Sequence, residues 1–93
     1  MRTIEYTRQF KRDYKRESQG QHRNTLKTIF PQLLAYLIND QPLTARYQDH
    51  PLTGEWRDFR DCHVRPDLIL IYRKHGNNVL QLVRLGSHSE LGL

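Results

Sequence analysis

The stretch Leu68-Ile69-Leu70-Ile71-Tyr72 constrains the fold more than any other part of the chain. Side chains on a strand point alternately to opposite faces of a sheet, so five consecutive apolar residues need cover on both faces. That requirement is typical of a central strand. A chain of 93 residues has room for one domain with a modest core. The sequence therefore predicts a single domain built around this strand.

Two helices are predicted before this strand. The second gives the strongest periodic signal, because its apolar residues recur at i, i+3 and i+4 for over three turns. Pro31 lies inside this pattern and predicts a kink or a late helix start. The first helix is predicted over residues 8–18, with Thr7 as its N-cap. The periodic residues of the second helix are Leu26, Ile29, Phe30, Leu33, Leu34, Leu37 and Ile38.

Short alternating segments predict four strands, over residues 2–6, 55–60, 63–74 and 79–85. Gly76-Asn77-Asn78 is a turn signal between the last two. The order is β-α-α-β-β-β, and three consecutive strands with short turns indicate an antiparallel meander. The predicted fold class is α+β, with two helices packed on one face of a mainly antiparallel four-stranded sheet.

The positive charge is concentrated at one end of the chain. The formal net charge is +5, yet residues 31–93 contain seven basic and seven acidic residues, so the excess lies in residues 1–30. A basic surface of this kind suits a polyanion such as nucleic acid. A solvated helix face explains it equally well. The first predicted helix supplies Lys11, Arg12, Lys15 and Arg16.

The composition predicts a cytoplasmic protein. Hydrophobic residues make up 37% and charged residues 27%, as in folded soluble domains. No apolar run reaches membrane-spanning length, and we find no signal peptide. The single cysteine, Cys62, excludes an intramolecular disulfide. Cys62 and His63 are neighbours on a predicted strand and point to opposite faces, so they do not form a catalytic pair.

Titratable residues gather where the predicted strands begin and end. His63 begins the third strand and His88 follows the fourth, so antiparallel pairing places both at the same end of the sheet. His50 reaches this end if its loop doubles back. The further candidates are Arg65 and Asp67, which share a face with His63 in a regular strand, and Arg84 on the neighbouring strand.

These residue types suit cleavage of RNA by its own 2′-hydroxyl. One group must remove the hydroxyl proton, a second must protonate the leaving oxygen, and cations must stabilise the phosphoryl oxygens. Histidine suits the first two roles, because its ordinary pKa of about 6.5 lies close to neutral pH. Arginine suits the third through paired hydrogen bonds to phosphate.

Structural roles compete with this hypothesis at each position. His50 can be a surface residue of its loop, His63 can bond a neighbouring carbonyl, and Asp67 can stabilise a turn after Pro66. Zinc bound by the three candidate histidines is a further alternative, although no paired metal-binding motif is present. His22 and His75 are predicted to be surface residues.

Three segments resemble the YafQ-type toxins of the RelE superfamily. They contain the sequences DHPLTGEW, RDCHVRPDLILIY and RLGSH, and the likeness runs from the predicted helices to the end of the chain. The resemblance implies a RelE-like fold and a type II toxin that cleaves mRNA in the ribosomal A site, without a metal or other cofactor. It also implies inhibition by a cognate antitoxin, through which alone the protein would contact operator DNA.

The resemblance also implies roles for particular residues. The catalytic set falls on His50, His63, Asp67 and His88, with His88 as the general acid and either His50 or Asp67 as the base. Arg84 is the implied phosphate ligand, and Arg60 and Arg65 are further substrate-binding candidates. The chain departs from the family pattern in two places. Leu68 stands where tryptophan is frequent, and Gly92-Leu93 replaces a terminal aromatic that could stack on an RNA base.

Two other functions remain open on the sequence. A catalytically silent relative would bind only its antitoxin and act as a co-repressor in a DNA-binding complex. A general RNA-binding α+β module would need neither acid nor base. Three histidines around one aspartate favour the enzyme over both.

Overall fold

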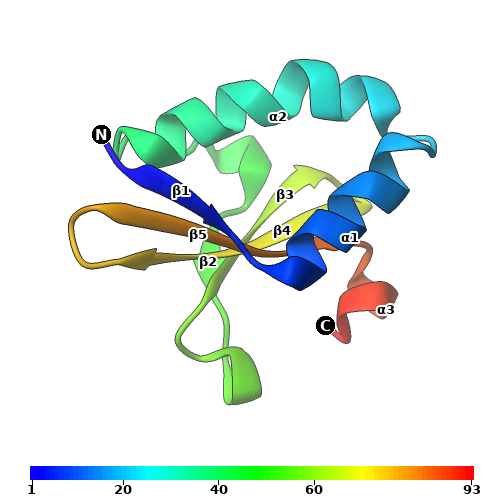
Figure 1. The fold of residues 1–93 in the computed structure, drawn as a ribbon. Coiled ribbons are helices and arrows are strands. Elements are labelled where there is room, and N and C mark those ends of the chain that lie inside the picture. The colour runs from blue at the N-terminus through cyan, green and yellow to red at the C-terminus, as the bar shows by residue number, and fades with distance from the viewer.

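The computed structural model describes all 93 residues as a five-stranded sheet with helices on both sides (Figure 1). The α+β class is confirmed, with one strand more than predicted. The strand order is β1-β5-β4-β3-β2. The elements are β1 (Thr3–Tyr6), α1 (Arg8–Ser18), α2 (Arg23–Ile38), β2 (His50–Pro51), β3 (Arg60–Arg65), β4 (Leu68–His75), β5 (Val79–Gly86) and α3 (His88–Leu91), with single 3-10 turns η1 (Ala45–Tyr47) and η2 (Gly54–Trp56).

The apolar run forms the centre of the sheet, as predicted. β4 lies between β5 and β3 and is antiparallel to both. β1 is parallel to β5 and β2 is antiparallel to β3, so only the β1–β5 pair departs from the antiparallel pattern. The turn predicted at Gly76-Asn77-Asn78 connects β4 to β5, and Gly76 takes a φ of +58° there.

The single strand predicted over residues 63–74 is wrong. The chain reverses at Pro66 and Asp67, so His63 lies near the end of β3 and pairs with Ile69 on β4. Proline lacks the amide that a ladder needs, and aspartate favours turns, so this dipeptide ends one strand before the next begins. His63 still lies at the predicted end of the sheet, because β3 ends where β4 starts.

The strand predicted over residues 55–60 is also wrong, because most of that segment is irregular. Gly54–Trp56 forms the 3-10 turn η2, and pairing with β2 starts only at Arg60. Trp56 and Phe59 are three residues apart, which suits one helical turn as well as a strand. Their rings meet edge to face at 5.3 Å and pack on the sheet.

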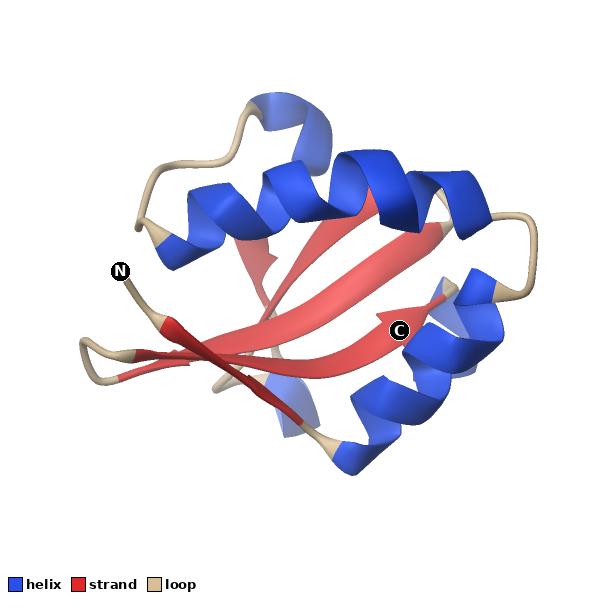
Figure 2. Ribbon diagram, turned by 45° about the horizontal axis from the view of Figure 1, so that its top comes forward, coloured by secondary structure: helices blue, strands red, loops and turns tan.

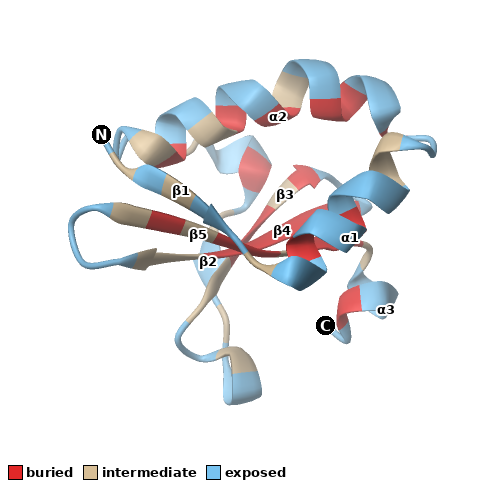
Figure 3. Cartoon of the chain, in the orientation of Figure 1, coloured by how far each residue is buried: buried red, intermediate tan, exposed pale blue.

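Helices lie over both faces of the sheet (Figure 2), and its central strand β4 is largely buried (Figure 3). Leu68, Leu70 and Tyr72 belong to the larger core under α1 and α2. Ile69 and Ile71 belong to a smaller cluster on the opposite face, where Leu91 of α3 and the η2 segment pack. Both long helices therefore lie on one face, as predicted, and the other face is covered by two short segments.

The helices begin where local capping allows. The Thr7 hydroxyl accepts a hydrogen bond from the Phe10 amide at 3.0 Å, which confirms the predicted cap of α1. Of the two outcomes predicted at Pro31, a kink or a late helix start, the late start is wrong, because α2 begins at Arg23 and continues through Pro31. Pro31 and Lys27, whose carbonyl loses its helical partner, are both exposed, so this carbonyl is not enclosed in the core. None of the helices is both long and apolar enough to cross a lipid bilayer.

The surface location predicted for His22 is wrong, whereas His75 is exposed. His22 has 7% relative exposure at the start of α2, and its Nε2 lies 3.5 Å from an Asp67 carboxylate oxygen. It helps to join the α1–α2 connection to the β3–β4 turn.

Candidate active site at one end of the sheet

Three histidines from different elements converge beside the smaller apolar cluster. β2 brings His50 opposite Asp61 of β3, His63 follows two residues later on the same strand, and His88 begins α3 after β5. The His63 ring lies 6.5 Å from the His50 ring and 5.3 Å from the His88 ring, between centroids. The predicted loop reversal therefore occurs, and all three rings lie at one end of the sheet.

A capping box holds His88 in place. The Ser87 hydroxyl accepts a hydrogen bond from the Glu90 amide at 3.2 Å, and the Glu90 carboxylate accepts one from the Ser87 amide at 2.9 Å. These reciprocal bonds satisfy two amides that a helix start leaves free. Leu91 then anchors the short helix in the smaller cluster. His88 stands between these anchors, and its side chain stays exposed.

A buried carboxylate lies behind the histidines. Asp61 has 2% relative exposure, and its Oδ1 is 3.0 Å from His50 Nδ1. That nitrogen also lies 2.8 Å from the Gln48 carbonyl, so one N–H faces two acceptors. Its hydrogen-bond geometry favours the carbonyl, and Asp61 Oδ1 has no hydrogen bond of its own. The carboxylate thus acts on the histidines mainly through its charge.

Sequence reasoning missed Asp61, although a signal for it was available. Asp61 and His63 are two residues apart on β3 and share one face, while Cys62 and Val64 between and after them face the long helices. Burial raises the pKa of the Cys62 thiol, and its position confirms that it does not meet His63.

Opposing effects set the charges in this cluster. Burial raises the pKa of Asp61, and attraction to His50, His63 and His88 opposes that rise. For His63, burial lowers the pKa, attraction to Asp61 raises it, and the other two histidines lower it further. The net effect is a lowered pKa, which favours the neutral form of His63. Because His50 Nδ1–H is held by acceptors, its Nε2 is free to accept a proton.

Two hollows flank the histidines. One, of about 440 Å³, is lined by His50, Asp61, His88 and Trp56, with the chain end Gly92-Leu93 at its rim. The other, of about 390 Å³, is lined by His63 together with Arg46 and Arg65. Sequence reasoning did not identify Trp56 or Arg46 as site residues. Both residues belong to the segment 43–59, and they reach the site only because this segment folds back onto β3.

Four other predicted site residues have partners of their own. Asp67 lies in the β3–β4 turn, at the same end of the sheet, where Gln21 Nε2 donates to it at 3.3 Å. None of the four forms a hydrogen bond or ion pair with the three histidines. Besides Asp67 they are Arg84, paired with Asp13 at 2.7 Å, Arg60, paired with Asp49 at 3.2 Å, and Arg65, which donates to the Thr25 hydroxyl at 3.2 Å.

The basic residues of α1 divide into two kinds. Lys11, Arg12 and Lys15 are exposed, and no ion pair in the structure involves them. Arg16 instead pairs with Asp13 at 3.1 Å and with Glu17 at 3.0 Å, and its Nε lies 3.3 Å from Glu90 of α3.

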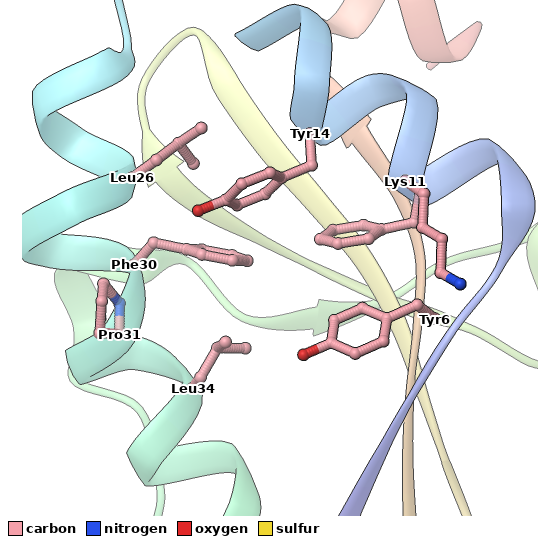
Figure 4. A pocket seen from close by; sticks show the side chains of 8 residues that line it. Tyr6, Lys11, Tyr14, Leu26, Phe30, Pro31 and Leu34 are labelled. Carbon is pink, nitrogen blue, oxygen red and sulfur yellow. The ribbon is translucent and has the colours of Figure 1, made fainter. Parts of the chain in front are cut away.

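An apolar groove lies between α1 and α2, away from the histidines (Figure 4). It measures about 470 Å³. The rings of Tyr6, Tyr14 and Phe30 point toward one another across it, and Lys11 stands on the α1 side. Tyr6 is 50% exposed and Tyr14 is 37% exposed, which leaves aromatic surface open to solvent. The other residues that line it are Phe10, Leu26, Pro31 and Leu34.

Fold and site together define a small α+β domain with a histidine cluster suited to proton transfer. The sequence pattern of the YafQ family, a bacterial toxin of type II toxin–antitoxin systems, matches residues 2–92, and the chain belongs to that family. The mRNA interferase toxin YafQ of Escherichia coli K12 is 44% identical over 91 residues, covering 97% of this chain and 95% of that protein.

Solved structures agree with this assignment. The E. coli DinJ–YafQ complex superposes with a TM-score of 0.79 at 43% identity, over 98% of both chains. A copper-bound mutant toxin from Helicobacter pylori superposes with a TM-score of 0.85 at 32% identity, over 98% of this chain and 99% of that one. In the present structure no group of three or more His, Cys, Asp or Glu side chains is arranged to hold a metal ion.

The lowered pKa of His63 predicts a pH-dependent contribution to stability. The folded protein takes up this proton at lower pH than the unfolded chain, whose His63 pKa is about 6.5. The contribution is therefore complete above that value and is lost as the pH falls through the folded pKa. Between about pH 8 and pH 5, Tm should fall more for the wild type than for His63→Gln.

Calorimetry or circular dichroism at several pH values measures this difference. His75→Gln removes an exposed histidine and should leave the wild-type pH dependence intact. Identical slopes for the wild type and His63→Gln would show that burial of the His63 ring has no such effect.

Proposed function

We propose that the protein is the toxin of a type II toxin–antitoxin system and an endoribonuclease that cleaves mRNA in the ribosomal A site. The observation that carries the proposal is the convergence of His50, His63 and His88 around the buried carboxylate of Asp61. Membership of the YafQ family and 44% identity to an mRNA interferase support it. Because the substrate lies on the ribosome, the protein would work in the cytoplasm.

The proposed chemistry is an intramolecular transesterification, in which the phosphorus exchanges its bond to the 5′-oxygen for a bond to the 2′-oxygen. The 2′-oxygen attacks the phosphorus as a base removes its proton, the bond to the 5′-oxygen breaks, and an acid protonates that oxygen. The products are a 2′,3′-cyclic phosphate and a 5′-hydroxyl, so atoms and charge balance without a metal. Two histidines of opposite protonation state satisfy both proton transfers.

We assign the acid to His88 and favour His50 as the base. His50 keeps its proton on Nδ1, between Gln48 and Asp61, which leaves Nε2 as the acceptor. Asp61 would steady the positive charge that His50 gains, as a buried aspartate does for histidine in serine proteases. His63 lies between the two rings and would contact the phosphoryl group. Asp67 remains the alternative base and would have to leave Gln21 and His22 to act.

Arginines beside the histidines would bind the RNA backbone. Arg46 and Arg65 line the hollow next to His63, where a flanking phosphate would lie. Arg60 and Arg84 would add positive charge, although both already pair with carboxylates. In the other hollow, Trp56 offers a ring for a nucleobase, in place of the terminal aromatic that Gly92-Leu93 replaces.

Replacing the proposed acid or base should remove cleavage without unfolding the protein. We expect His88→Ala and His50→Ala each to lower the single-turnover rate on ribosomes by about 10²- to 10⁴-fold, the usual contribution of an acid or base. Both side chains are exposed, so both variants should stay folded. Tm should change little for His88→Ala and fall modestly for His50→Ala, which removes a partner of the buried Asp61 carboxylate. Mapping of mRNA 5′ ends, with and without ribosomes and with chelator-treated protein, measures the rate and its requirements.

The pH–rate profile separates the two candidate bases. If His50 is the base, His50→Ala loses the dependence on deprotonation near neutral pH, while Asp67→Ala retains it at a reduced or unchanged rate. The reverse result would assign the base to Asp67. Wild-type cleavage by His88→Ala would contradict the acid assignment.

The exposed cations of α1 are proposed to contact ribosomal RNA. Lys11, Arg12 and Lys15 lack internal partners, unlike Arg16, the fourth residue of the basic set that the sequence suggests for nucleic-acid binding. Neutralising these three to Gln should weaken ribosome binding and flatten the slope of log affinity against log salt by about one for each lost phosphate contact. Titrations at two salt concentrations measure this slope. An unchanged affinity and slope would mean that this face is merely solvated.

The aromatic groove is proposed to hold an apolar segment of the antitoxin with acidic residues at its flank. The groove leaves tyrosine rings exposed, and α1, its basic wall, lies in the part of the chain that contains the whole charge excess. DinJ, which forms a complex with the related E. coli YafQ, shows that such a partner exists for a relative.

Two tyrosines of equal exposure provide a matched test of the groove. Tyr14 lines it and Tyr36 lies on α2 outside it, and each is 37% exposed. Tyr14→Ala should weaken antitoxin binding by about tenfold or more, while retaining cleavage, because a buried aromatic anchor is typically a hot spot. Tyr36→Ala should bind normally. Calorimetric titration with the purified antitoxin decides, and equal affinities for both variants would exclude this groove as the docking site.

A further inference from the structure

We propose that Arg16 and Asp13 of α1, acting through Glu90 of α3, position His88 for catalysis. The inference rests on the proposed function of His88 as the general acid. It assigns Arg16 a role within the toxin itself, distinct from contact with ribosomal RNA. Three observations carry it: the uncovered edge of β5, the carboxylate that meets Arg16 there, and the close fit of both around Gly86.

The edge of β5 lacks a strand partner just before the site. β1 pairs with β5 only as far as Leu82, so the backbone beyond that residue needs other partners. Side chains of α1 and its cap supply them. The Thr7 hydroxyl donates to the Val83 carbonyl at 2.7 Å, and the carboxylate of Asp13 accepts from the Leu85 amide at 3.0 Å. Arg16 donates to the Leu85 carbonyl at 2.9 Å.

Asp13 is the buried centre of this arrangement. Its relative exposure is 3%, and it binds the Arg84 guanidinium at 2.7 Å and that of Arg16 at 3.1 Å as well as the Leu85 amide. A buried carboxylate needs such partners, and removing one of them is costly. Asp13 therefore fixes the orientation of Arg16 from the helix side.

Arg16 extends this arrangement to α3. Its Nε lies 3.3 Å from the Glu90 carboxylate. The hydrogen bond from the Ser87 amide lowers the pKa of Glu90 most, and the charge of Arg16 lowers it further, so Glu90 stays ionised. Gly86 lies directly beneath this pair. A Cβ there would lie 3.0 Å from Arg16 Nη2 and 3.1 Å from Glu90 Oε1, so both side chains close tightly over this position.

These contacts enclose His88 on both sides in the chain. Gly86 and Ser87 precede it and Glu90 follows it, and all three belong to the arrangement just described. A competing explanation is that burial of Leu91 anchors α3 alone, so that Arg16 is dispensable. The two explanations differ in what loss of the Arg16 charge does to His88.

The capping box provides a selective variant. Glu90→Gln keeps the hydrogen bonds of the cap, since glutamine also serves in a capping box, but it removes the charge that Arg16 contacts. Arg16→Ala removes the other partner. Arg8→Ala is the matched control, because Arg8 is an exposed arginine on the same helix without an ion pair.

Single-turnover cleavage on ribosomes tests the positioning role. We expect Arg16→Ala to lower the maximal rate by about 10- to 100-fold, the range for a misplaced catalytic group, with the ribosome concentration for half-maximal rate nearly unchanged. Glu90→Gln should show a smaller loss, and the double variant should be no slower than Arg16→Ala, because both act through one contact. Arg8→Ala should match the wild type. Two results would overturn the proposal: rate losses of Arg16→Ala and Glu90→Gln that add in the double variant, or a change only in the ribosome concentration for half-maximal rate. The second result would assign Arg16 to ribosome docking.

A second measurement does not depend on cleavage. The amides of Leu91, the last residue of α3, and of Leu93, two residues further on, donate to the carbonyls of Ser87 and His88 respectively. Hydrogen exchange at both should accelerate in Arg16→Ala and Glu90→Gln but not in Arg8→Ala. Unchanged hydrogen exchange would overturn the proposal that Arg16 and Glu90 hold α3 in place, even if cleavage fell. If the wild type fails to cleave RNA while the two variants show faster exchange, the proposed function of His88 is refuted. The contact of Arg16 with Glu90 as an anchor of α3 would still be supported.

Discussion

The whole structure depends on covering both faces of β4. The five apolar residues from Leu68 to Tyr72 have no exposed side, so each face of the sheet needs its own layer. The two long helices supply one layer, and they leave the opposite face to whatever chain remains. That remainder is the η2 segment and the short α3, whose Leu91 packs on Ile69 and Ile71. Because His50 precedes the η2 segment and His88 begins α3, covering the second face also assembles the histidine cluster.

The histidine cluster compensates the buried negative charge of Asp61 at the edge of that layer. Asp61 faces the same side as the apolar residues and is nearly inaccessible to water, so its negative charge is costly there. Three histidines surround it, and each stabilises the carboxylate when it is protonated. The same environment raises the pKa of Asp61 and lowers that of His63. Opposite shifts of neighbouring titratable groups are what allow one to give a proton and another to take it.

Sequence reasoning succeeded where a signal is local and failed where it is tertiary. The helix periodicity, the Thr7 cap and the doubly apolar strand all follow from residues within a few positions of one another. The β3–β4 turn was considered at Asp67 but one continuous strand was predicted, because the apolar run that follows outweighed the turn chemistry of Pro66-Asp67. The η2 segment was missed because Trp56 and Phe59 fit a strand or a helical turn. Asp61 could have been found from its two-residue spacing to His63 on one strand, but Arg46 became recognisable only when η1 had been placed against β3, which no local pattern specifies.

Helix α1 shows how one short element serves three surfaces. Phe10 and Tyr14, four residues apart, face α2 and build the aromatic groove. Asp13 and Arg16, three residues apart, complete the hydrogen bonding of β5 beyond the reach of β1. The remaining basic residues face solvent. The narrow apolar side of this helix follows from that division, because a helix that replaces a strand edge needs polar side chains where an ordinary core helix has leucines. The ion pairs of Asp13 and Arg16 lie against the end of β5, which leads directly to His88. The side chains that complete the strand edge therefore also connect α1 to the histidine cluster.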